Sequence, residues 1–241
     1  MNDSRFFPPA SQALPNGLLA IDGELDPRWL FDAYTHGIFP WPITDPRRDS
    51  SVLAWWAPNP RGIFEWDNIH IPKRMLSLVK SDYFEITCDT DFEGVMRGCA
   101  SPRQDSSETW VTPEMIDAYC QFHEEGWAHS VEAKRDGRLV GGVYGVAING
   151  LFAAESMFYR EPNASKVALI RLLDHLFVRG FKLVDVQIVN ENTARFGASE
   201  ISRRLYMKRL NAALKDKETS FGDEMSEFTQ FGTLFPRKTQ M

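Results

Sequence analysis

Two polar side chains stand two residues apart in an otherwise apolar stretch of the sequence. Asp185 and Gln187 alternate with Val184 and Val186 in the segment VDVQIVN. Because side chains alternate between the two faces of a strand, the pattern predicts that Asp185 and Gln187 share one face. The valines and Ile188 then share the other. A carboxylate next to an amide can bind a cation, orient an amine or handle a proton.

A second carboxylate, Glu155, lies in the apolar stretch LFAAESMFYR. Alternation predicts that Glu155, Met157 and Tyr159 share one face of a strand. If this strand neighbours the one that carries Asp185, the two carboxylates meet in one cleft, where they could bind a cationic group or manage a proton. An exposed or structurally paired carboxylate is the alternative.

The histidines and cysteines do not form a metal-binding pattern. His123 and His129 lie six residues apart with a helix stop between them, whereas an HExxH zinc site needs two histidines on one helical face. The three cysteines are widely spaced and form no CxxC pair. We therefore expect structural histidines and no metal.

Two adjacent glycines, Gly141 and Gly142, lie inside a predicted strand. A phosphate-binding motif would place them in a loop between a strand and a helix. Within a strand, glycines instead indicate that another backbone or a ligand comes close.

Aromatic and basic residues suggest a local nucleic-acid contact. Trp41 lies in a Pro-rich loop, where a ring can stack on a nucleobase, although core packing is the alternative. Lys73, Arg74 and Lys80 fall near one face of a predicted helix. They could form a small phosphate patch or a solvated helix face.

Caps, stops and turn signals predict the elements that position these residues. Asp136-Gly137 and Asn149-Gly150 are hairpin turns that divide residues 128–160 into three antiparallel strands. Other strands are predicted at residues 83–88 and 181–188, and helices at residues 26–37, 73–80, 112–126, 163–180 and 200–216. The order is α+β and matches acyltransferases of the GNAT type, which is an analogy of fold and not of function.

The composition of the chain changes near residues 65–70. The preceding part is irregular and rich in Pro, Trp and Gly, whereas helices and strands alternate regularly afterwards. We therefore expect a small N-terminal domain at residues 1–67 and a catalytic domain at residues 68–241.

Length and charge restrict the function further. The chain has 241 residues and a formal net charge of −6. A protein that binds nucleic acid over its whole surface is usually basic, so any such partner must be held by a local patch. There is neither an apolar run of about 20 residues, as a membrane span needs, nor a signal peptide. We expect a cytoplasmic protein.

Several long motifs, in order, resemble the leucyl/phenylalanyl-tRNA–protein transferase family. They include PNGLLAIDGELDPRWLFDAYTHGIFPW, WWAPNPRGIF, TWVTPEMIDAYCQFHEEGWAHSVE, LVGGVYGVAINGLFAAESMF, NASKVAL and DVQIVNENTARFGASEISRR. The resemblance covers roughly residues 8–210. It implies a small N-terminal domain followed by a GNAT-like acyltransferase domain with a mixed, largely antiparallel sheet.

The resemblance also implies a reaction. The family transfers Leu, Phe or Met from aminoacyl-tRNA to the N-terminal Arg or Lys of a protein, which creates an N-degron, and it needs neither metal nor coenzyme A. We expect a cytoplasmic monomer whose partners are aminoacyl-tRNA and such proteins.

Two residues match the family's D-x-Q motif, which is proposed to deprotonate and orient the acceptor amine. These are Asp185 and Gln187. An amide oxygen is too weak a base to hold a proton at neutral pH, so we expect Gln187 to accept a hydrogen bond and aim the amine. Asp185 could polarise Gln187, collect the proton or pair with the cationic N-terminal residue. Glu155 fits the last role too.

The donor site is also implied by matching positions. Val143, Met157, Leu172 and Val184 correspond to the family's aminoacyl pocket. The preference between Leu and Phe stays open, because one methylene is worth only about 1–3 kcal/mol in such a pocket.

Contacts with the tRNA follow from the same comparison. Trp41 and Trp110 match tryptophans near the terminal adenosine. Lys73, Arg74 and Lys80 remain as the basic cluster for the acceptor stem.

Two other functions stay open. An acetyl-CoA-dependent N-acetyltransferase of the same fold would need a Gly-rich pyrophosphate turn, and the corresponding FYREPNASK has no glycine. A non-catalytic protein that binds tRNA or degrons would not require Asp185, Gln187 and Glu155 together.

Overall fold

The computed structural model describes residues 3–45, 50–101 and 110–229. Its main feature is a seven-stranded mixed sheet in the order β12-β6-β11-β10-β9-β8-β7. These strands are Ala198–Ile201 (β12), Arg61–Phe64 (β6), Leu183–Gln187 (β11), Leu151–Tyr159 (β10), Arg138–Ile148 (β9), Ala128–Arg135 (β8) and Glu85–Cys88 (β7). Only β10 and β11 pair in parallel, and the other neighbours are antiparallel.

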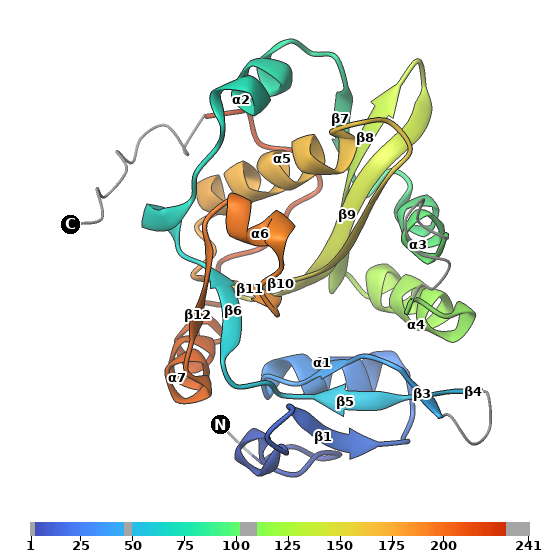
Figure 1. Ribbon diagram of the computed structural model, residues 1–241, viewed down its shortest axis with the longest axis vertical. Coiled ribbons are helices and arrows are strands. Elements are labelled where there is room, and N and C mark those ends of the chain that lie inside the picture. Colours follow the sequence, from blue (N-terminus) through green and yellow to red (C-terminus); the bar gives the residue numbers. More distant parts are fainter. Residues whose placement is uncertain (1–2, 46–49, 102–109, 230–241) are drawn as a thin grey trace.

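Helices cover both faces of this sheet (Figure 1). On one face, α5 (Ala164–Val178) and α2 (Lys73–Lys80) pack on the strands around an apolar cluster that we call the α5 core. On the other face, α3 (Phe92–Ala100) and α4 (Pro113–Glu124) share a second cluster with α1 (Pro27–Thr35). α7 (Arg203–Ala213) contributes Tyr206 and Leu210 to a third cluster with β6 and β11.

The N-terminal part forms a small module below the sheet (Figure 1). It contains α1 and a three-stranded sheet of β1 (Leu18–Ile21), β5 (Ala54–Trp56) and β2 (Phe39–Pro40). β3 (Ile43–Asp45) and β4 (Ser50–Val52) form a separate hairpin. β6 leaves this module and is hydrogen-bonded between β11 and β12 of the large sheet. The expected domain division after residue 67 stays a prediction.

The strands separate where the polar residues predicted from the sequence lie. β10 and β11 pair only between Leu151–Ala153 and Leu183–Asp185. Beyond that point a bulge interrupts β10 between Ala154 and Ser156, so Glu155 is the extra residue. A second irregularity interrupts β11 between Asp185 and Gln187. Bulges bend a strand and change the direction of a side chain, so the two irregularities open the sheet at this position.

Most of the predicted elements are confirmed, and their caps explain why. The side chain of Asp26 accepts a hydrogen bond from the backbone N–H of Trp29 at the start of α1, and Thr112 does the same for Met115 in α4. Asn163 precedes α5, but it has φ 72° and makes no capping hydrogen bond with its side chain. The sequence did not predict α3, the short α6 (Glu191–Arg195) or β12, and the last helix begins at Arg203, after a Ser202 cap.

Gly141 and Gly142 admit neighbouring protein atoms. A Cβ on Gly141 would lie 2.5 Å from the Cβ of Ala164 and 2.9 Å from the backbone N of Ser165. A Cβ on Gly142 would lie 2.8 Å from a methyl group of Val95. We expected either another backbone or a ligand close to these glycines. At Gly141 the structure shows a backbone, because the start of α5 packs directly on β9.

None of the helices within the described ranges is both long and apolar enough to cross a membrane.

Candidate active site

Asp185 is buried, and protein groups occupy both of its carboxylate oxygens. Oδ1 accepts hydrogen bonds from Arg61 Nε at 2.9 Å and from the backbone N of Gln187 at 2.8 Å. Oδ2 accepts from Arg61 Nη2 at 2.6 Å and from the Tyr206 hydroxyl at 2.7 Å. An arginine that donates two parallel bonds to a carboxylate forms one of the strongest and most directional pairs in proteins. Asp185 is therefore held rigidly in place by its neighbours.

Arg61 joins this carboxylate to the N-terminal module. Its third nitrogen, Nη1, donates to the backbone carbonyl of Gly37 at 2.9 Å. The guanidinium lies 4.8 Å from the ring centre of Phe39 and 4.5 Å from that of Tyr206. Burial opposes its charge, but the Asp185 carboxylate, together with Tyr206 and Glu155, raises the pKa of Arg61 above its ordinary value. Arg61 is therefore kept charged although it is almost inaccessible to solvent.

The role of Arg61 was not predicted from the sequence, although WWAPNPRGIF contains it. Its importance is visible in the structure, where all four residues of the RGIF strand are buried, because a charged residue is almost never fully buried unless it is paired.

Gln187 has an unusual backbone conformation. Its φ is +56°, in a region that residues with a Cβ rarely adopt. The backbone N–H of Ile188 donates to the carbonyl of Val186 at 2.6 Å, which closes a three-residue turn around Gln187. This turn ends the strand. The predicted alternation is therefore wrong after Val186, and Ile188 is 49% exposed instead of sharing the buried face of the valines.

The side chains of Gln187 and Glu155 meet at the opening between β10 and β11. Gln187 Nε2 donates to Glu155 Oε1 at 2.6 Å. The condition for Glu155 and Asp185 to come together, that their strands are neighbours, is met, since β10 and β11 pair directly. Glu155 is only partly buried by its neighbours, whereas Asp185 is inaccessible. Of the two residues, Glu155 is therefore the more accessible to solvent.

Glu155 has a strongly shifted pKa. Burial, to which the nearby Asp185 charge adds, raises its pKa to about 8 against the opposing effect of a hydrogen bond from Tyr34. The hydroxyl of Tyr34 is in turn 2.5 Å from that of Tyr119. The Glu155 side chain is therefore mostly protonated and neutral at pH 7.

The bulge also separates Glu155 from Met157. Met157 packs against the α5 core, whereas Tyr34 and Tyr119, the neighbours of Glu155, belong to the cluster on the other face of the sheet. The prediction that Glu155 and Met157 share a face is therefore wrong, because the extra residue reverses the alternation.

The four residues expected to line the aminoacyl pocket lie in one cluster. Val143, Leu172 and Val184 are buried in the α5 core, and Met157 packs against it. Val143 and Met157 are directly opposite each other on β9 and β10. Val184 precedes Asp185 in the chain, so this cluster lies on the other side of β11 from the Arg61 pair.

Trp41 and Trp110 stack on each other, although they are far apart in the sequence. Their ring centres are 5.3 Å apart, with planes inclined by 27°. Trp41 is 38% exposed, so one of the stacked rings is accessible from solvent.

Lys73, Arg74 and Lys80 are all exposed on α2. α2 and the N-terminal module lie toward opposite ends of the long axis of the molecule (Figure 1). A ligand that contacts both must therefore be extended.

The two histidines have structural partners. His123 Nδ1 is 2.7 Å from the carbonyl of Ala128, and His129 Nδ1 is 2.7 Å from Asp89 Oδ2. Within the described parts of the chain, no group of three or more His, Cys, Asp or Glu residues could hold a metal ion.

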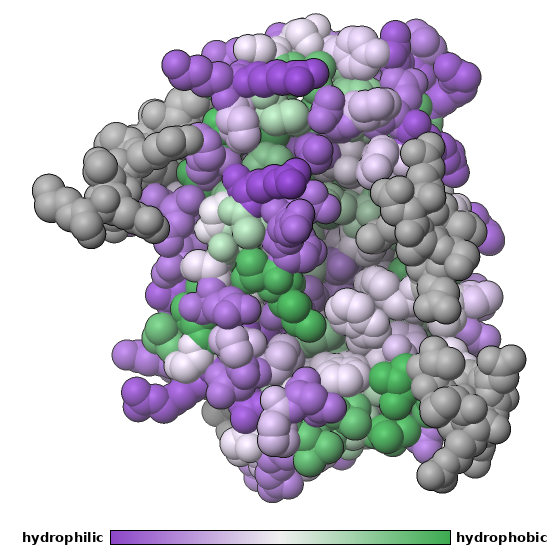
Figure 2. Space-filling view, viewed as in Figure 1, coloured by the Kyte–Doolittle hydropathy of each residue, from purple (hydrophilic) through white to green (hydrophobic). Residues whose placement is uncertain are grey.

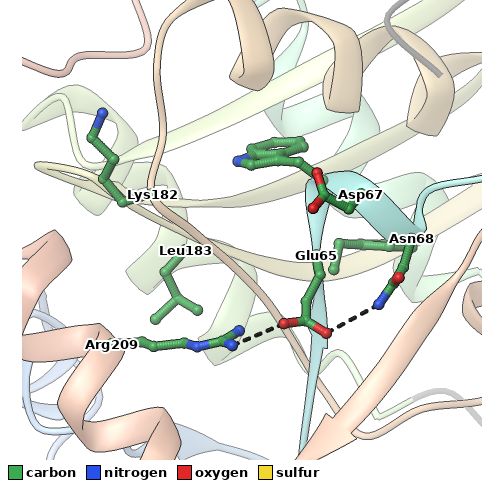
Figure 3. Close-up of a pocket in the computed structure, with 8 residues that line it drawn as sticks. Glu65, Asp67, Asn68, Lys182, Leu183 and Arg209 are labelled. Carbon is green, nitrogen blue, oxygen red and sulfur yellow. Dashed lines mark hydrogen bonds and ion pairs between the residues drawn. The ribbon is translucent and has the colours of Figure 1, made fainter. Parts of the chain in front are cut away.

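A pocket of about 290 Å³ lies elsewhere, at the other end of β11 (Figure 3). Its Glu65 accepts hydrogen bonds from Arg209 at 2.8 Å and from Asn68 at 3.0 Å. Leu183, which lines this pocket, is the first residue of β11, whereas Gln187 is the last. The charged Glu65 and Arg209 of this pocket are thus paired with each other, away from the Gln187 and Glu155 side chains.

The turn at Gln187 predicts that a glycine variant is more stable than an alanine variant, the reverse of the usual order in helices and strands. Gln187→Gly and Gln187→Ala both remove the side chain, but only glycine adopts φ +56° without strain, and the left-handed conformation costs other residues about 1–2 kcal/mol. We expect Gln187→Gly to have the higher free energy of unfolding in urea, by about 1 kcal/mol. A more stable alanine variant would show that the backbone is not held in this conformation.

The raised pKa of Glu155 predicts a pH-dependent loss of stability. Between the ordinary carboxyl pKa of 4.5 and the folded value of about 8, the unfolded chain ionises Glu155 while the folded chain keeps its proton, so stability falls as pH rises. Glu155→Gln cannot ionise. We expect the difference in melting temperature, variant minus wild type, to be larger at pH 8 than at pH 5. Glu124→Gln, on the exposed end of α4, is the control, and an equal change in both variants would contradict the assignment.

Comparison with known proteins agrees with the motifs. Residues 23–59 match a family model described as the leucyl/phenylalanyl-tRNA protein transferase N-terminal domain, and residues 63–211 match the model of the leucyl/phenylalanyl-tRNA protein transferase. A leucyl/phenylalanyl-tRNA–protein transferase of Saccharophagus degradans is 45% identical over 88% of this chain and 86% of its own. One of Pseudomonas putida is 44% identical over 83% of this chain and 88% of its own.

Solved structures are less similar. The structure of L-PGS from Bacillus licheniformis is 12% identical and covers 75% of this chain and 55% of that chain, with a TM-score of 0.38. It is the match of both family models and of close relatives over most of their length that shows the relationship. The chain belongs to the leucyl/phenylalanyl-tRNA protein transferase family of aminoacyltransferases.

Proposed function

We propose that the chain transfers Leu, Phe or Met from aminoacyl-tRNA to the N-terminal Arg or Lys of proteins, thereby creating an N-degron. Beyond family membership, the observation that supports this reaction is the pair of Gln187 and Glu155 at the opening between β10 and β11. In this proposal, the amide and the neutral, partly exposed acid face the amine of the acceptor and the ester of the donor. The expected monomer and its cytoplasmic location stay predictions.

The reaction is the attack of the acceptor α-amine on the ester carbonyl of the charged tRNA. A C–N bond forms, the C–O bond to the terminal ribose breaks, and the ribose oxygen gains the proton that the amine loses. Holding the two reactants together supplies much of the acceleration in such a reaction. Gln187 Nε2 is engaged by Glu155, which leaves Oε1 to accept a hydrogen bond from the amine and aim its lone pair.

Asp185 acts on Gln187 and not on the substrate in this proposal. Each of its oxygens already accepts two hydrogen bonds, so it offers little to an incoming amine or cation. Its contact with Gln187 is through the backbone N–H and not through the side chain. We therefore assign recognition of the acceptor's cation to Glu155.

Recognition by Glu155 requires a change of protonation. The carboxyl is mostly neutral at pH 7 in the free protein, since burial raises its pKa to about 8. A guanidinium or ammonium group that docks next to it favours the ionised form. Binding of an N-terminal Arg or Lys therefore releases a proton, and binding strengthens as pH rises toward 8.

The donor is held at three places in this proposal. Val143, Met157, Leu172 and Val184 contact the Leu, Phe or Met side chain, the Trp41–Trp110 stack contacts the terminal adenosine, and Lys73, Arg74 and Lys80 contact phosphates. Figure 2 shows a small group of hydrophobic residues near the middle of one face, whereas Val143, Leu172 and Val184 are themselves buried. The N-terminal module and α2 lie toward opposite ends of the molecule in Figure 1, an arrangement that an extended ligand such as a tRNA acceptor arm could span.

The two alternatives are not favoured. The segment between β10 and α5, residues 160–163, contains no glycine, and the chain belongs to a family of aminoacyl-tRNA transferases instead of acetyltransferases. A protein that only binds tRNA or degrons would not need the strained backbone turn at Gln187.

Peptides that differ only at the N-terminus test the acceptor. With charged tRNA as donor, we expect transfer of radiolabelled Leu and Phe to peptides beginning with Arg or Lys and not to those beginning with Ala or Glu. The KM for the Arg peptide should fall between pH 6.5 and pH 8, and Glu155→Gln should raise this KM and remove its pH dependence. Transfer to the Ala peptide at a comparable rate would show that the enzyme does not recognise a positively charged N-terminal side chain.

Salt dependence tests the phosphate patch. We expect Lys73→Ala combined with Lys80→Ala to raise the KM for charged tRNA. The slope of log KM against log salt should become shallower by roughly 1–2, because each phosphate contact contributes about 0.9. Lys134→Ala combined with Arg138→Ala, at the β8–β9 hairpin, removes the same charge elsewhere and is the control. An equal effect of both double variants would place the tRNA contact outside α2.

A further inference from the structure

We infer that Arg61 and Tyr206 are positioning residues for the transfer reaction: through Asp185 they hold the left-handed turn that aims Gln187, and Arg61 ties this turn to the N-terminal module. The role in transfer rests on the proposed function. The mechanical part, that these residues enforce the turn, is independent of it.

The turn needs an external support. Its own hydrogen bond, from the Ile188 N–H to the Val186 carbonyl, spans only three residues, and turns of this kind with positive φ are rare and strained. Such conformations persist where the surrounding structure determines them fully. The second hydrogen bond of the turn comes from outside its backbone, because the Gln187 N–H donates to Asp185 Oδ1.

That support depends on the direction of one carboxylate. Arg61 Nε also donates to Oδ1, while Arg61 Nη2 and the Tyr206 hydroxyl both donate to Oδ2. Four donors on two oxygens fix the plane of the carboxylate, so Oδ1 points at the Gln187 N–H. The buried Asp185 carboxylate thus orients the turn, and it can do so without any contact with the substrate.

Arg61 extends the same arrangement to the donor side. Its Nη1 donates to the Gly37 carbonyl, and Phe39 stacks on its guanidinium. Both residues belong to the segment that leads into Trp41, two residues after Phe39. A single side chain therefore connects the segment that carries the proposed adenosine platform with the residue that aims the acceptor amine.

A double-mutant cycle between Tyr206 and Gln187 tests the aiming. Tyr206→Phe removes one hydrogen bond to Asp185 and keeps the ring that stacks on Arg61. We expect it to lower kcat about tenfold while leaving both KM values within about twofold, the scale of one hydrogen bond to a charged group. In a Gln187→Ala background it should lower kcat by less than about twofold, since residues that act as a unit are not additive. An equal loss in both backgrounds would overturn the inference.

Stability measurements test the support of the turn without reference to activity. We expect the stability advantage of Gln187→Gly over Gln187→Ala in urea unfolding to shrink by at least half when Tyr206 is replaced by Phe, because the alanine can then relax its backbone. An unchanged advantage would show that the turn does not depend on Asp185. If the wild type transfers nothing to any peptide and yet this advantage shrinks, the proposed function is wrong and the support of the turn stands.

Arg61→Lys tests the connection to the N-terminal module. Lysine keeps the charge but cannot donate to Asp185 and Gly37 in the planar arrangement of arginine. We expect a loss of kcat larger than that of Tyr206→Phe together with a raised KM for charged tRNA, which Tyr206→Phe leaves unchanged. Arg209→Lys, which alters the partly buried pair with Glu65 outside the candidate active site, is the matched control. An unchanged KM for charged tRNA in Arg61→Lys would remove the connection to the module.

Discussion

The buried pair of Arg61 and Asp185 is the interaction on which the rest of the site depends. Removing two charges from water is costly, and their attraction offsets this cost only where the geometry is good and the remaining donors and acceptors are satisfied. Here Arg61 donates to Asp185 and to the Gly37 carbonyl, and Tyr206 completes the shell. Such a pair contributes little net stability. What it provides is a fixed direction for a carboxylate between two modules.

The irregular backbone of the site follows from the same constraint. In a regular sheet, β10 and β11 would run side by side and leave no opening between them. The bulge at Glu155 and the turn at Gln187 separate the strands just after Ala153 and Asp185. Two contacts stabilise this irregular backbone. Asp185 accepts a hydrogen bond from the backbone N–H of Gln187, and the side chain of Gln187 donates one to Glu155.

The fold could be predicted largely from local signals. Caps such as Asp26 and Thr112, and turns such as Asp136-Gly137, determine helix starts and hairpins through nearby atoms alone. The helix α3 was missed, as was the strand β12, which pairs with β6 across more than 130 residues of sequence. Pairing between such distant segments leaves no periodic trace in a single sequence.

The site was predicted less completely, for a related reason. The polar residues Asp185, Gln187 and Glu155 were recognisable because they interrupt apolar strands. Their directions were not, since a bulge or a left-handed turn reverses the alternation from which faces are inferred. Arg61 cannot be recognised in this way because its partner lies 124 residues away, and the burial of its strand, which shows that it needs a partner, is visible only in the structure.

The distribution of charge around Gln187 suits the chemistry of an amine nucleophile. An α-amine has a pKa near 8 and attacks only when neutral. A free carboxylate next to it would favour the ammonium form and slow the reaction. Here Asp185 is paired with Arg61, and burial keeps Glu155 largely protonated. In the proposed reaction, the acceptor's cationic side chain takes up the Glu155 charge, and the amine meets only the uncharged amide of Gln187. The proposal therefore assigns recognition by charge to the acceptor's side chain and leaves its reacting nitrogen in neutral surroundings.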